Sequence, residues 1–273
     1  MKQKIINIII LQLFIIAALC GYLFIRDYRT AQEEISEYTS IQEQFTTVAQ
    51  NTKIEVIDEP DDEIGNVQIP PAWAGLPLIE VDFEALLLIN PDTVGWIAIP
   101  NTPVSYPVVQ TTNNAKYLTT SFNGTYSRAG TPFVDRNNAI QILDKNTIIY
   151  GHNMGVGRDD MFGSLLEYKE REYFIEHRYI QFDTIHKNFG WWEVFAVIEY
   201  DSRSNDFQFL QIKYNDNFMD WIDRIREFSI HDSDTEINPN DRILTLSTCD
   251  RGNFGRSGRL LILAVHVNFI ALG

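Results

Sequence analysis

One cysteine near the C-terminal end of the chain has the surroundings of a nucleophile. Cys249 ends the stretch from Thr245 to Cys249, and Arg259 follows ten residues later. An apolar, β-branched run precedes the cysteine, a glycine-bearing loop follows it, and residues 260–267 are typical of a returning strand. We therefore expect Cys249 and Arg259 near the same end of a β-hairpin. There the guanidinium could stabilise an oxyanion beside a reactive sulfur.

A cysteine nucleophile needs a base or an ion-pairing imidazole. A free thiol has a pKa of roughly 8.5, so only a few per cent is ionised at neutral pH. His152 has a suitable local setting, because the apolar run from Thr147 to Tyr150 leads directly into Gly151 and His152. Like Cys249, this histidine is expected where a strand gives way to a loop.

The other four histidines have weaker settings. His231 lies in an acidic loop, where a solvated side chain is expected, and His177 and His186 flank a short strand with no nucleophile near them in sequence. His266 lies seven residues beyond Arg259, which is about 23 Å along a strand. His152 is therefore the expected base.

Taken together, these stretches resemble a known family. Tyr150 to Met154, Thr245 to Cys249 and Arg259 are similar to the motifs of the sortases, the membrane-anchored cysteine transpeptidases of Gram-positive bacterial surfaces. Asp82 to Thr102 looks like the opening of the class B sortases, and the resemblance extends from about Ile79 to Val267. It implies a mainly β fold with a helix in the long connection before the cysteine strand.

The resemblance also implies roles for individual residues. His152, Cys249 and Arg259 would be catalytic. Five residues would line the groove that binds the sorting signal: Asn114, Leu118, Ser247, Thr248 and Asp250. Asp250 could instead orient His152 or be solvated.

Composition narrows the function further. The 273-residue chain carries a net charge of −15 and is 45% hydrophobic, which suits a globular domain but argues against nucleic-acid binding, because no basic stripe is present. Its two cysteines, Cys20 and Cys249, are expected inside and outside the membrane respectively, which argues against a disulfide or a cysteine zinc site. Nothing in the sequence calls for a metal or organic cofactor.

The N-terminal segment is predicted to be a membrane anchor. Residues 1–4 carry two lysines, and residues 5–25 are apolar except for Asn7 and Gln12, a run long enough to cross the hydrocarbon core as a helix. The alternative is a cleaved signal peptide, or a lipoprotein signal ending at Cys20. Leu19 is bulky where a cleavage site requires a small residue. The positive charges at the two ends of the apolar run balance, so they do not determine the orientation of the helix. The resemblance to the sortases implies that the N-terminus lies inside the cell.

Residues 26–76 are expected to be an extracellular stem and linker. From Tyr28 to Gln50 the apolar positions recur at spacings of three and four, which predicts an amphipathic helix. The following segment, Glu55 to Pro71, is dense in acidic residues and proline and predicts a solvated linker.

Residues 77–273 are expected to form the catalytic domain. Its many short strands and few long helices predict a closed β-barrel of about eight strands. Strands are expected at Val94–Ile99, Ser105–Gln110, Thr131–Val134, Thr147–Tyr150, Tyr179–Phe182, Trp191–Tyr200, Ile243–Thr248 and Leu260–Val267. Helices are expected at Phe83–Leu88, Met161–Tyr168 and Asn217–Phe228. The connection from Asp201 to Asp241 is expected to shape the groove.

The function that the resemblance implies is transpeptidation. The partners would be secreted surface proteins with a C-terminal sorting signal, a peptidoglycan cross-bridge or stem-peptide amine, and the membrane. A cysteine endopeptidase that finishes with water, a sortase that polymerises pilus subunits, and a catalytically silent binding module remain alternatives.

Overall fold

The computed structural model describes residues 2–48, 75–186, 190–204 and 217–267. The chain divides into two compact units, Met1–Gln44 and Phe45–Gly273. Helix α1 spans Lys2–Phe45 and continues through Arg26 and Asp27. The apolar run and the amphipathic run, which the sequence suggested as separate segments, therefore belong to one helix.

The helix that was expected to reach Gln50 ends earlier. After Phe45 the chain forms strand β1 (Thr46–Val48), which pairs antiparallel with β2 (Ile79–Val81). The three residues of β1 are β-branched, and such side chains favour a strand over a helix. The expected acidic linker, Glu55 to Pro71, lies outside the described residues.

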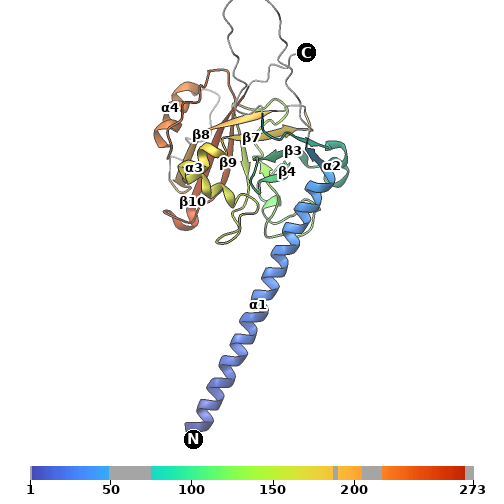
Figure 1. Ribbon diagram of the computed structural model, residues 1–273, viewed down its shortest axis with the longest axis vertical. Helices are drawn as coiled ribbons and strands as arrows, with labels where there is room; N and C mark the ends of the chain where they lie inside the picture. Colours follow the sequence, from blue (N-terminus) through green and yellow to red (C-terminus); the bar gives the residue numbers. More distant parts are fainter. Residues whose placement is uncertain (1, 49–74, 187–189, 205–216, 268–273) are drawn as a thin grey trace, which may run out of the picture. The chain divides into compact units, whose positions relative to one another are not determined.

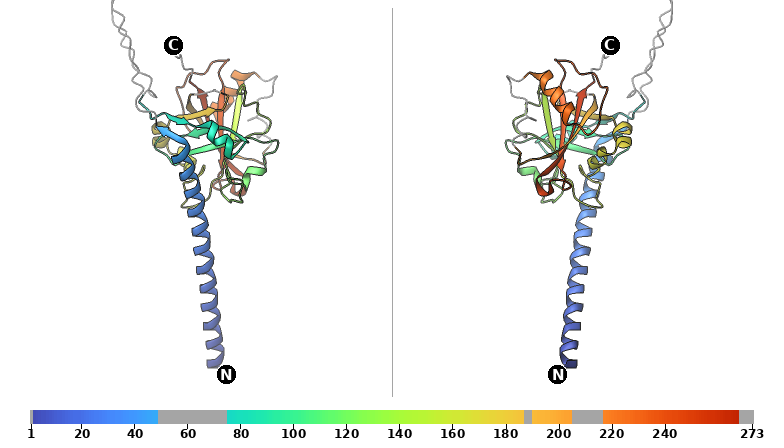
Figure 2. Two further views of the ribbon diagram at one scale, coloured as in Figure 1. Left: turned by 90° about the vertical axis from the view of Figure 1, so that its right-hand side faces the viewer. Right: turned by 90° about the vertical axis from the view of Figure 1, so that its left-hand side faces the viewer.

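The second unit is built around a closed barrel of eight strands (Figures 1 and 2). The strands are β3 (Thr93–Ala98), β4 (Ser105–Val109), β5 (Phe133–Val134), β6 (Asn146–Tyr150), β7 (Tyr179–Thr184), β8 (Trp191–Asp201), β9 (Ile243–Cys249) and β10 (Gly258–His266). Their order is β10-β8-β7-β3-β4-β5-β6-β9. The pairs β4–β5 and β6–β9 are parallel, and the other pairs are antiparallel. The predicted barrel is confirmed.

Short helices occupy the connections. They are α2 (Phe83–Ile89), η1 (Lys116–Leu118), η2 (Ser164–Lys169), α3 (Arg171–Glu176), α4 (Phe218–Phe228) and η4 (Gly255–Ser257). The helix expected from Met161 begins only at Ser164 and has 3-10 geometry. Met161 has a φ of 53°, a left-handed conformation that an α-helix does not accommodate.

Helix α4 supports the strands that carry the reactive residues. Its side chains Trp221, Ile222 and Ile225 are buried in one apolar cluster with Ile198 of β8 and Leu261 of β10. Figure 1 shows the helix beside β8. Burying such side chains stabilises the fold by about 1.5–3 kcal/mol each, so α4 fixes the β8–β10 side of the barrel.

Candidate active site

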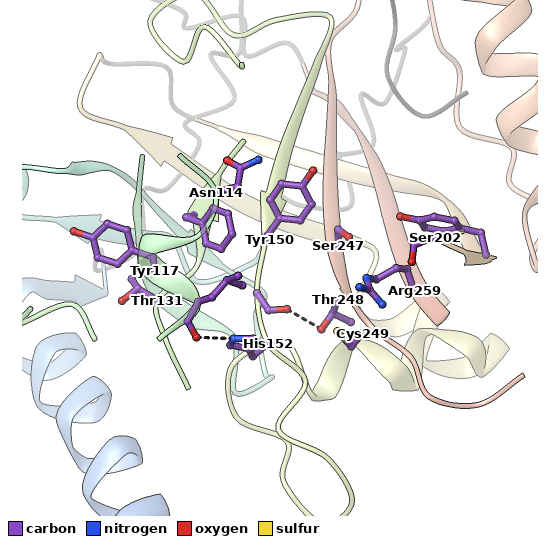
Figure 3. Close-up of a pocket in the computed structure, with 14 residues that line it drawn as sticks. Asn114, Tyr117, Thr131, Tyr150, His152, Ser202, Ser247, Thr248, Cys249 and Arg259 are labelled. Carbon is purple, nitrogen blue, oxygen red and sulfur yellow. Dashed lines mark hydrogen bonds between the residues drawn. The ribbon is translucent and has the colours of Figure 1, made fainter. Parts of the chain in front are cut away.

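A cleft of about 290 Å³ opens beside the ends of β6, β8, β9 and β10 (Figure 3). Seven of the eight residues singled out from the sequence line it: Asn114, Leu118, His152, Ser247, Thr248, Cys249 and Arg259. Cys249 is a free, half-buried cysteine. Its sulfur is therefore not sealed in the barrel interior.

The hairpin of β9 and β10 sets the relation between the sulfur and the guanidinium. Arg259 lies directly opposite Cys249 in the register, and residues opposite each other in an antiparallel pair lie about 5 Å apart with side chains on the same face. The amide of Asp250 donates to the carbonyl of Gly258 at 3.0 Å where the loop begins and ends. A Cβ at Gly258 would lie 2.0 Å from the Asp250 oxygen, so glycine is required there. The predicted hairpin is confirmed.

The parallel pairing of β6 with β9 brings His152 beside Cys249. Tyr150 lies opposite Ser247, and His152 and Cys249 each follow two residues later. Parallel strands point in one direction and lie about 4.8 Å apart. The histidine and the cysteine therefore leave neighbouring strands at the same level of the barrel.

Three hydrogen bonds continue this pairing beyond the end of β6. The amide of Gly151 donates to the Ser247 carbonyl at 3.1 Å, the Thr248 hydroxyl donates to the Gly151 carbonyl at 2.9 Å, and Asn153 Nδ2 donates to the Cys249 carbonyl at 2.9 Å. A Cβ at Gly151 would lie 2.5 Å from the Phe162 ring. Glycine is therefore needed at this position because the Phe162 ring packs directly against it.

The imidazole of His152 is held by a backbone carbonyl. Its Nε2 lies 2.8 Å from the carbonyl oxygen of Leu118 (Figure 3). A carbonyl oxygen only accepts hydrogen bonds, so Nε2 carries a proton. In the neutral ring, Nδ1 is then the nitrogen with the free lone pair.

The guanidinium of Arg259 is held by hydrogen bonds from Nη1. Its Nη1 donates to the carbonyls of Arg256 and Gly258 at 3.2 and 2.8 Å. These bonds use both protons on Nη1. The donors on Nε and Nη2 have no hydrogen-bond partner among the described residues. They are available to an oxyanion in the cleft.

Asp250 is the one singled-out residue that does not line this cleft. It lines a neighbouring groove, where its buried carboxylate pairs with Lys169 Nζ at 2.5 Å and accepts from the Gly252 amide at 3.0 Å. Lys169 also pairs with Glu199. Burial raises the pKa of Asp250, but the hydrogen bonds from Lys169 and Gly252 outweigh it and hold the pKa below its usual value. The carboxylate therefore binds Lys169.

Replacing Lys169 with methionine should destabilise the barrel by about 1–3 kcal/mol, because Asp250 and Glu199 lose their shared cation. A carboxylate whose pKa is lowered by folding stabilises the fold above its unfolded pKa of about 3.9, and this stabilisation is lost as the pH falls through the folded pKa. The difference from wild type should therefore be largest near pH 7 and shrink below about pH 4. The urea midpoints of the detergent-solubilised wild type and variant, at pH 7 and below about pH 4, measure this difference.

The matched control is Arg203→Met, which removes the cation of the exposed pair with Asp201. Exposed pairs contribute little to stability, so this variant should unfold close to wild type. Equal midpoints for Lys169→Met and wild type at pH 7 would contradict a stabilising role for Lys169.

Several cleft residues were not singled out from the sequence. Tyr200 and Ser202, at the end of β8, line the cleft together with Tyr150 of β6. Tyr200 lies opposite Arg259 in the register. Burial raises its pKa well above the usual range, so its hydroxyl stays protonated. Tyr150, Tyr200 and Ser202 share with His152 and Cys249 a position at the end of a strand. This position is the feature of the sequence that could have identified them.

The other histidines lie outside the cleft. His231, expected to be solvated, is 9% exposed, and its Nε2 bonds the Tyr168 carbonyl at 2.9 Å. That expectation was wrong because the loop folds back onto η2. His177 is also buried and bonds the Pro100 carbonyl. In the part of the chain that the structure describes, no group of three or more His, Cys, Asp or Glu side chains is placed to hold a metal ion.

Comparison with known proteins identifies relatives of the whole barrel. The sequence model of the sortase domain matches residues 97–267. The chain is 35% identical to sortase B of Listeria monocytogenes over 183 residues, which cover 66% of this chain and 72% of that protein. It is 27% identical to sortase B of Staphylococcus aureus over 262 residues, which cover 96% of each.

Solved structures agree with the sequence comparisons. A sortase B–substrate complex from Staphylococcus aureus superposes with a TM-score of 0.62 and 31% identity, covering 68% of this chain and 84% of that one. Sortase B of Bacillus anthracis in complex with AAEK1 gives a TM-score of 0.68 and 26% identity, covering 89% of this chain and 100% of that one.

Proposed function

This chain belongs to the sortase family, in class B, whose members are cell-wall cysteine transpeptidases, and we propose that His152, Cys249 and Arg259 are its catalytic residues. One observation carries this proposal. The parallel register of β6 with β9 and the antiparallel register of β9 with β10 bring the three residues to one level beside one cleft.

The first step is acyl transfer to the enzyme. The Cys249 thiolate attacks a backbone carbonyl carbon of the sorting motif, which in sortases is that of a threonine, and a tetrahedral oxyanion forms. The free donors of Arg259 stabilise this oxyanion. As the C–N bond breaks, His152 gives the departing amine the Nδ1 proton that it took from the Cys249 thiol, and a thioester remains on Cys249.

The second step releases the product. An amine of the peptidoglycan attacks the thioester carbonyl. The C–S bond then breaks, and the Cys249 thiolate is regenerated. His152 takes up the proton that the attacking amine loses, so it ends the cycle as it began. Asn114, Leu118, Ser247 and Thr248 line the same cleft and are proposed to contact the sorting signal.

Product analysis tests this function. Incubation of the purified protein with a sorting-motif peptide library and an oligoglycine or diaminopimelate-containing amine should give a peptide–amine adduct, which mass spectrometry detects. Only a transpeptidase forms this adduct. Cleavage with hydrolysis products alone would support an endopeptidase instead, and absence of cleavage by a protein whose Cys249 reacts with thiol reagents would contradict both.

We also propose that α1 anchors the protein in the membrane with its N-terminus inside and the catalytic domain outside. Among the described residues, α1 is the helix that is long and apolar enough to span a bilayer. The large apolar side chains between Ile5 and Ile25 are exposed, as lipid-facing side chains are. Protease added to intact cells should remove the catalytic domain, and full protection of this domain would contradict the orientation.

A further inference from the structure

The hydrogen bond that fixes the His152 ring depends on a short segment far from it in sequence. Its acceptor is the carbonyl of Leu118, the last residue of η1. The Leu118 side chain is 40% exposed, so its own packing does not hold this carbonyl in place. The anchor of η1 is the preceding residue, Tyr117, whose side chain is 3% exposed.

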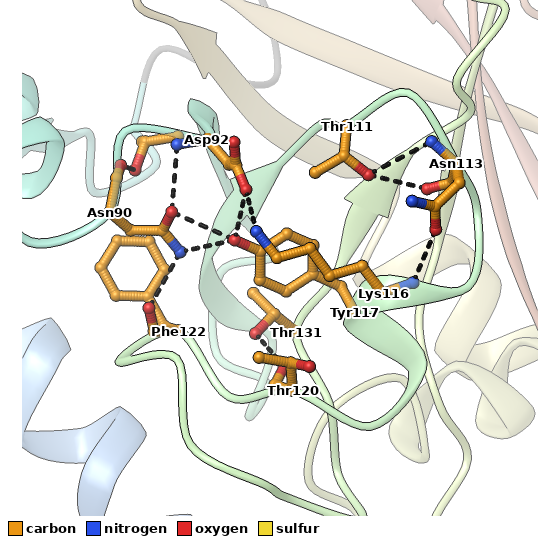
Figure 4. A network of polar contacts seen from close by, with 10 residues as sticks. Asn90, Asp92, Thr111, Asn113, Lys116, Tyr117, Thr120, Phe122 and Thr131 are labelled. Atoms are coloured by element: carbon orange, nitrogen blue, oxygen red, sulfur yellow. Dashed lines mark hydrogen bonds and ion pairs between the residues drawn. The ribbon is translucent and has the colours of Figure 1, made fainter.

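The hydroxyl of Tyr117 is the centre of a buried polar network (Figure 4). Asn90 Nδ2 donates to this hydroxyl at 2.9 Å, and the hydroxyl lies 2.9 Å from Asp92 Oδ2 and 3.1 Å from Asn90 Oδ1. A hydroxyl has one proton, and a carboxylate is the stronger acceptor. Tyr117 therefore donates to Asp92 and accepts from Asn90.

Asn90 joins this network to the end of helix α2 and to the loop at Phe122. It is the C-cap of α2 and is 5% exposed. Its Nδ2 donates to the Phe122 carbonyl at 2.9 Å, and its Oδ1 accepts from the Asp92 amide at 3.0 Å. Lys116 Nζ pairs with Asp92 at 2.5 Å on the solvent side. The Tyr117 hydroxyl is thus held by two side chains, Asn90 and Asp92, which are themselves held by other groups.

The backbone of η1 is held as well. The Tyr117 carbonyl accepts from the Thr131 amide at 3.0 Å, and the Thr119 carbonyl accepts from the Ser127 amide at 3.1 Å. These two bonds lie on either side of Leu118. Together with the side-chain network they hold the segment whose Leu118 carbonyl lies 2.8 Å from His152 Nε2.

We propose that Asn90, Asp92 and Tyr117 are positioning residues for His152 and act through the Leu118 carbonyl. The proposal rests on the proposed catalytic role of His152. A fixed carbonyl keeps the proton on Nε2 and the ring in one orientation, so that Nδ1 is always the nitrogen that exchanges protons. Without it, the neutral ring can carry its proton on either nitrogen.

Tyr117→Phe tests this by removing the hydroxyl while keeping the ring. We expect kcat for transpeptidation to fall roughly 10- to 100-fold with little change in KM, because misplacing a catalytic group by about 1 Å costs that order of rate. In ¹⁵N-histidine spectra at a pH where the rings are neutral, His152 should change from the Nε2–H form to a mixture of both tautomers.

Asn90→Ala is the second variant, because Tyr117 also lines the cleft and Asn90 does not. It should reproduce the change in kcat and in the His152 spectrum. Tyr168→Phe is the matched control, since it removes another buried tyrosine hydroxyl, which donates instead to the backbone carbonyl of His177 at 2.6 Å. It should leave the His152 spectrum unchanged.

The proposal is overturned if Tyr117→Phe and Asn90→Ala keep the wild-type His152 spectrum, whatever their activity. A loss of rate that Tyr168→Phe shares, with that spectrum unchanged, would also overturn it, because the effect would then be general destabilisation. The spectrum is read without turnover. It therefore tests the positioning separately from the reaction that the enzyme catalyses.

Discussion

Replacing Cys249 with alanine should lower the rate of sorting-peptide cleavage and of amine transfer by about 10⁴-fold or more, to below detection. No thioester can form without the sulfur. The neighbouring Ser247 and Thr248 hydroxyls cannot replace it, because a neutral hydroxyl is a far weaker nucleophile than a thiolate. Cleavage assays with a fluorescent sorting peptide, together with mass spectrometry of the trapped acyl-enzyme, measure the loss.

Cys20→Ala is the control for this variant. Cys20 is the other free cysteine and lies in α1, not in the cleft. Its replacement should leave both activities at the wild-type level. Substantial turnover by Cys249→Ala would mean that another group attacks the peptide, and the assignment of the nucleophile would have to be abandoned.

Arg259→Lys should lower kcat by about 10²- to 10³-fold, although the positive charge is kept. Nη1 of the arginine is occupied by the Arg256 and Gly258 carbonyls, while Nε and Nη2 remain free for the oxyanion. A lysine has one nitrogen, which cannot hold these carbonyls and at the same time present two donors in the geometry of the fork. Steady-state kinetics with the same peptide measures the change.

Arg256→Lys is the matched control in the same loop. The Arg256 side chain is exposed, and its contact with Arg259 is made by its backbone carbonyl, which lysine retains. This variant should therefore keep its kcat. Wild-type turnover by Arg259→Lys would remove the proposed oxyanion role and would leave the arginine as a structural residue of the hairpin.

The local parts of the site were predictable from the sequence. The strand before Cys249, the turn after it and the returning strand all lie within about 25 residues, so the hairpin that places Arg259 opposite Cys249 follows from short-range patterns. The position of Asp250 was not predicted. The resemblance placed it in the groove that binds the sorting signal, whereas its carboxylate lies in the neighbouring groove, where it pairs with Lys169, a residue 81 positions away in sequence.

Other features were decided by partners distant in sequence. The helix expected to reach Gln50 ends at Phe45 because Thr46 to Val48 pair with β2, more than 30 residues away. His231 is buried because Tyr168 lies beside it. Hydrophobic periodicity contains no information on such contacts, since it reports which face of an element is buried and not which element covers it.

The sequence by itself determined the chemical groups and the local elements that carry them: a thiol, an imidazole and a guanidinium, each at a strand end, on a chain with an apolar N-terminal helix. Only the tertiary structure decided that β6 runs parallel to β9 and that η1 presents the Leu118 carbonyl to His152. The physical reason is that these contacts join residues 34 to about 100 positions apart. Their register depends on how the whole barrel closes and not on any local pattern.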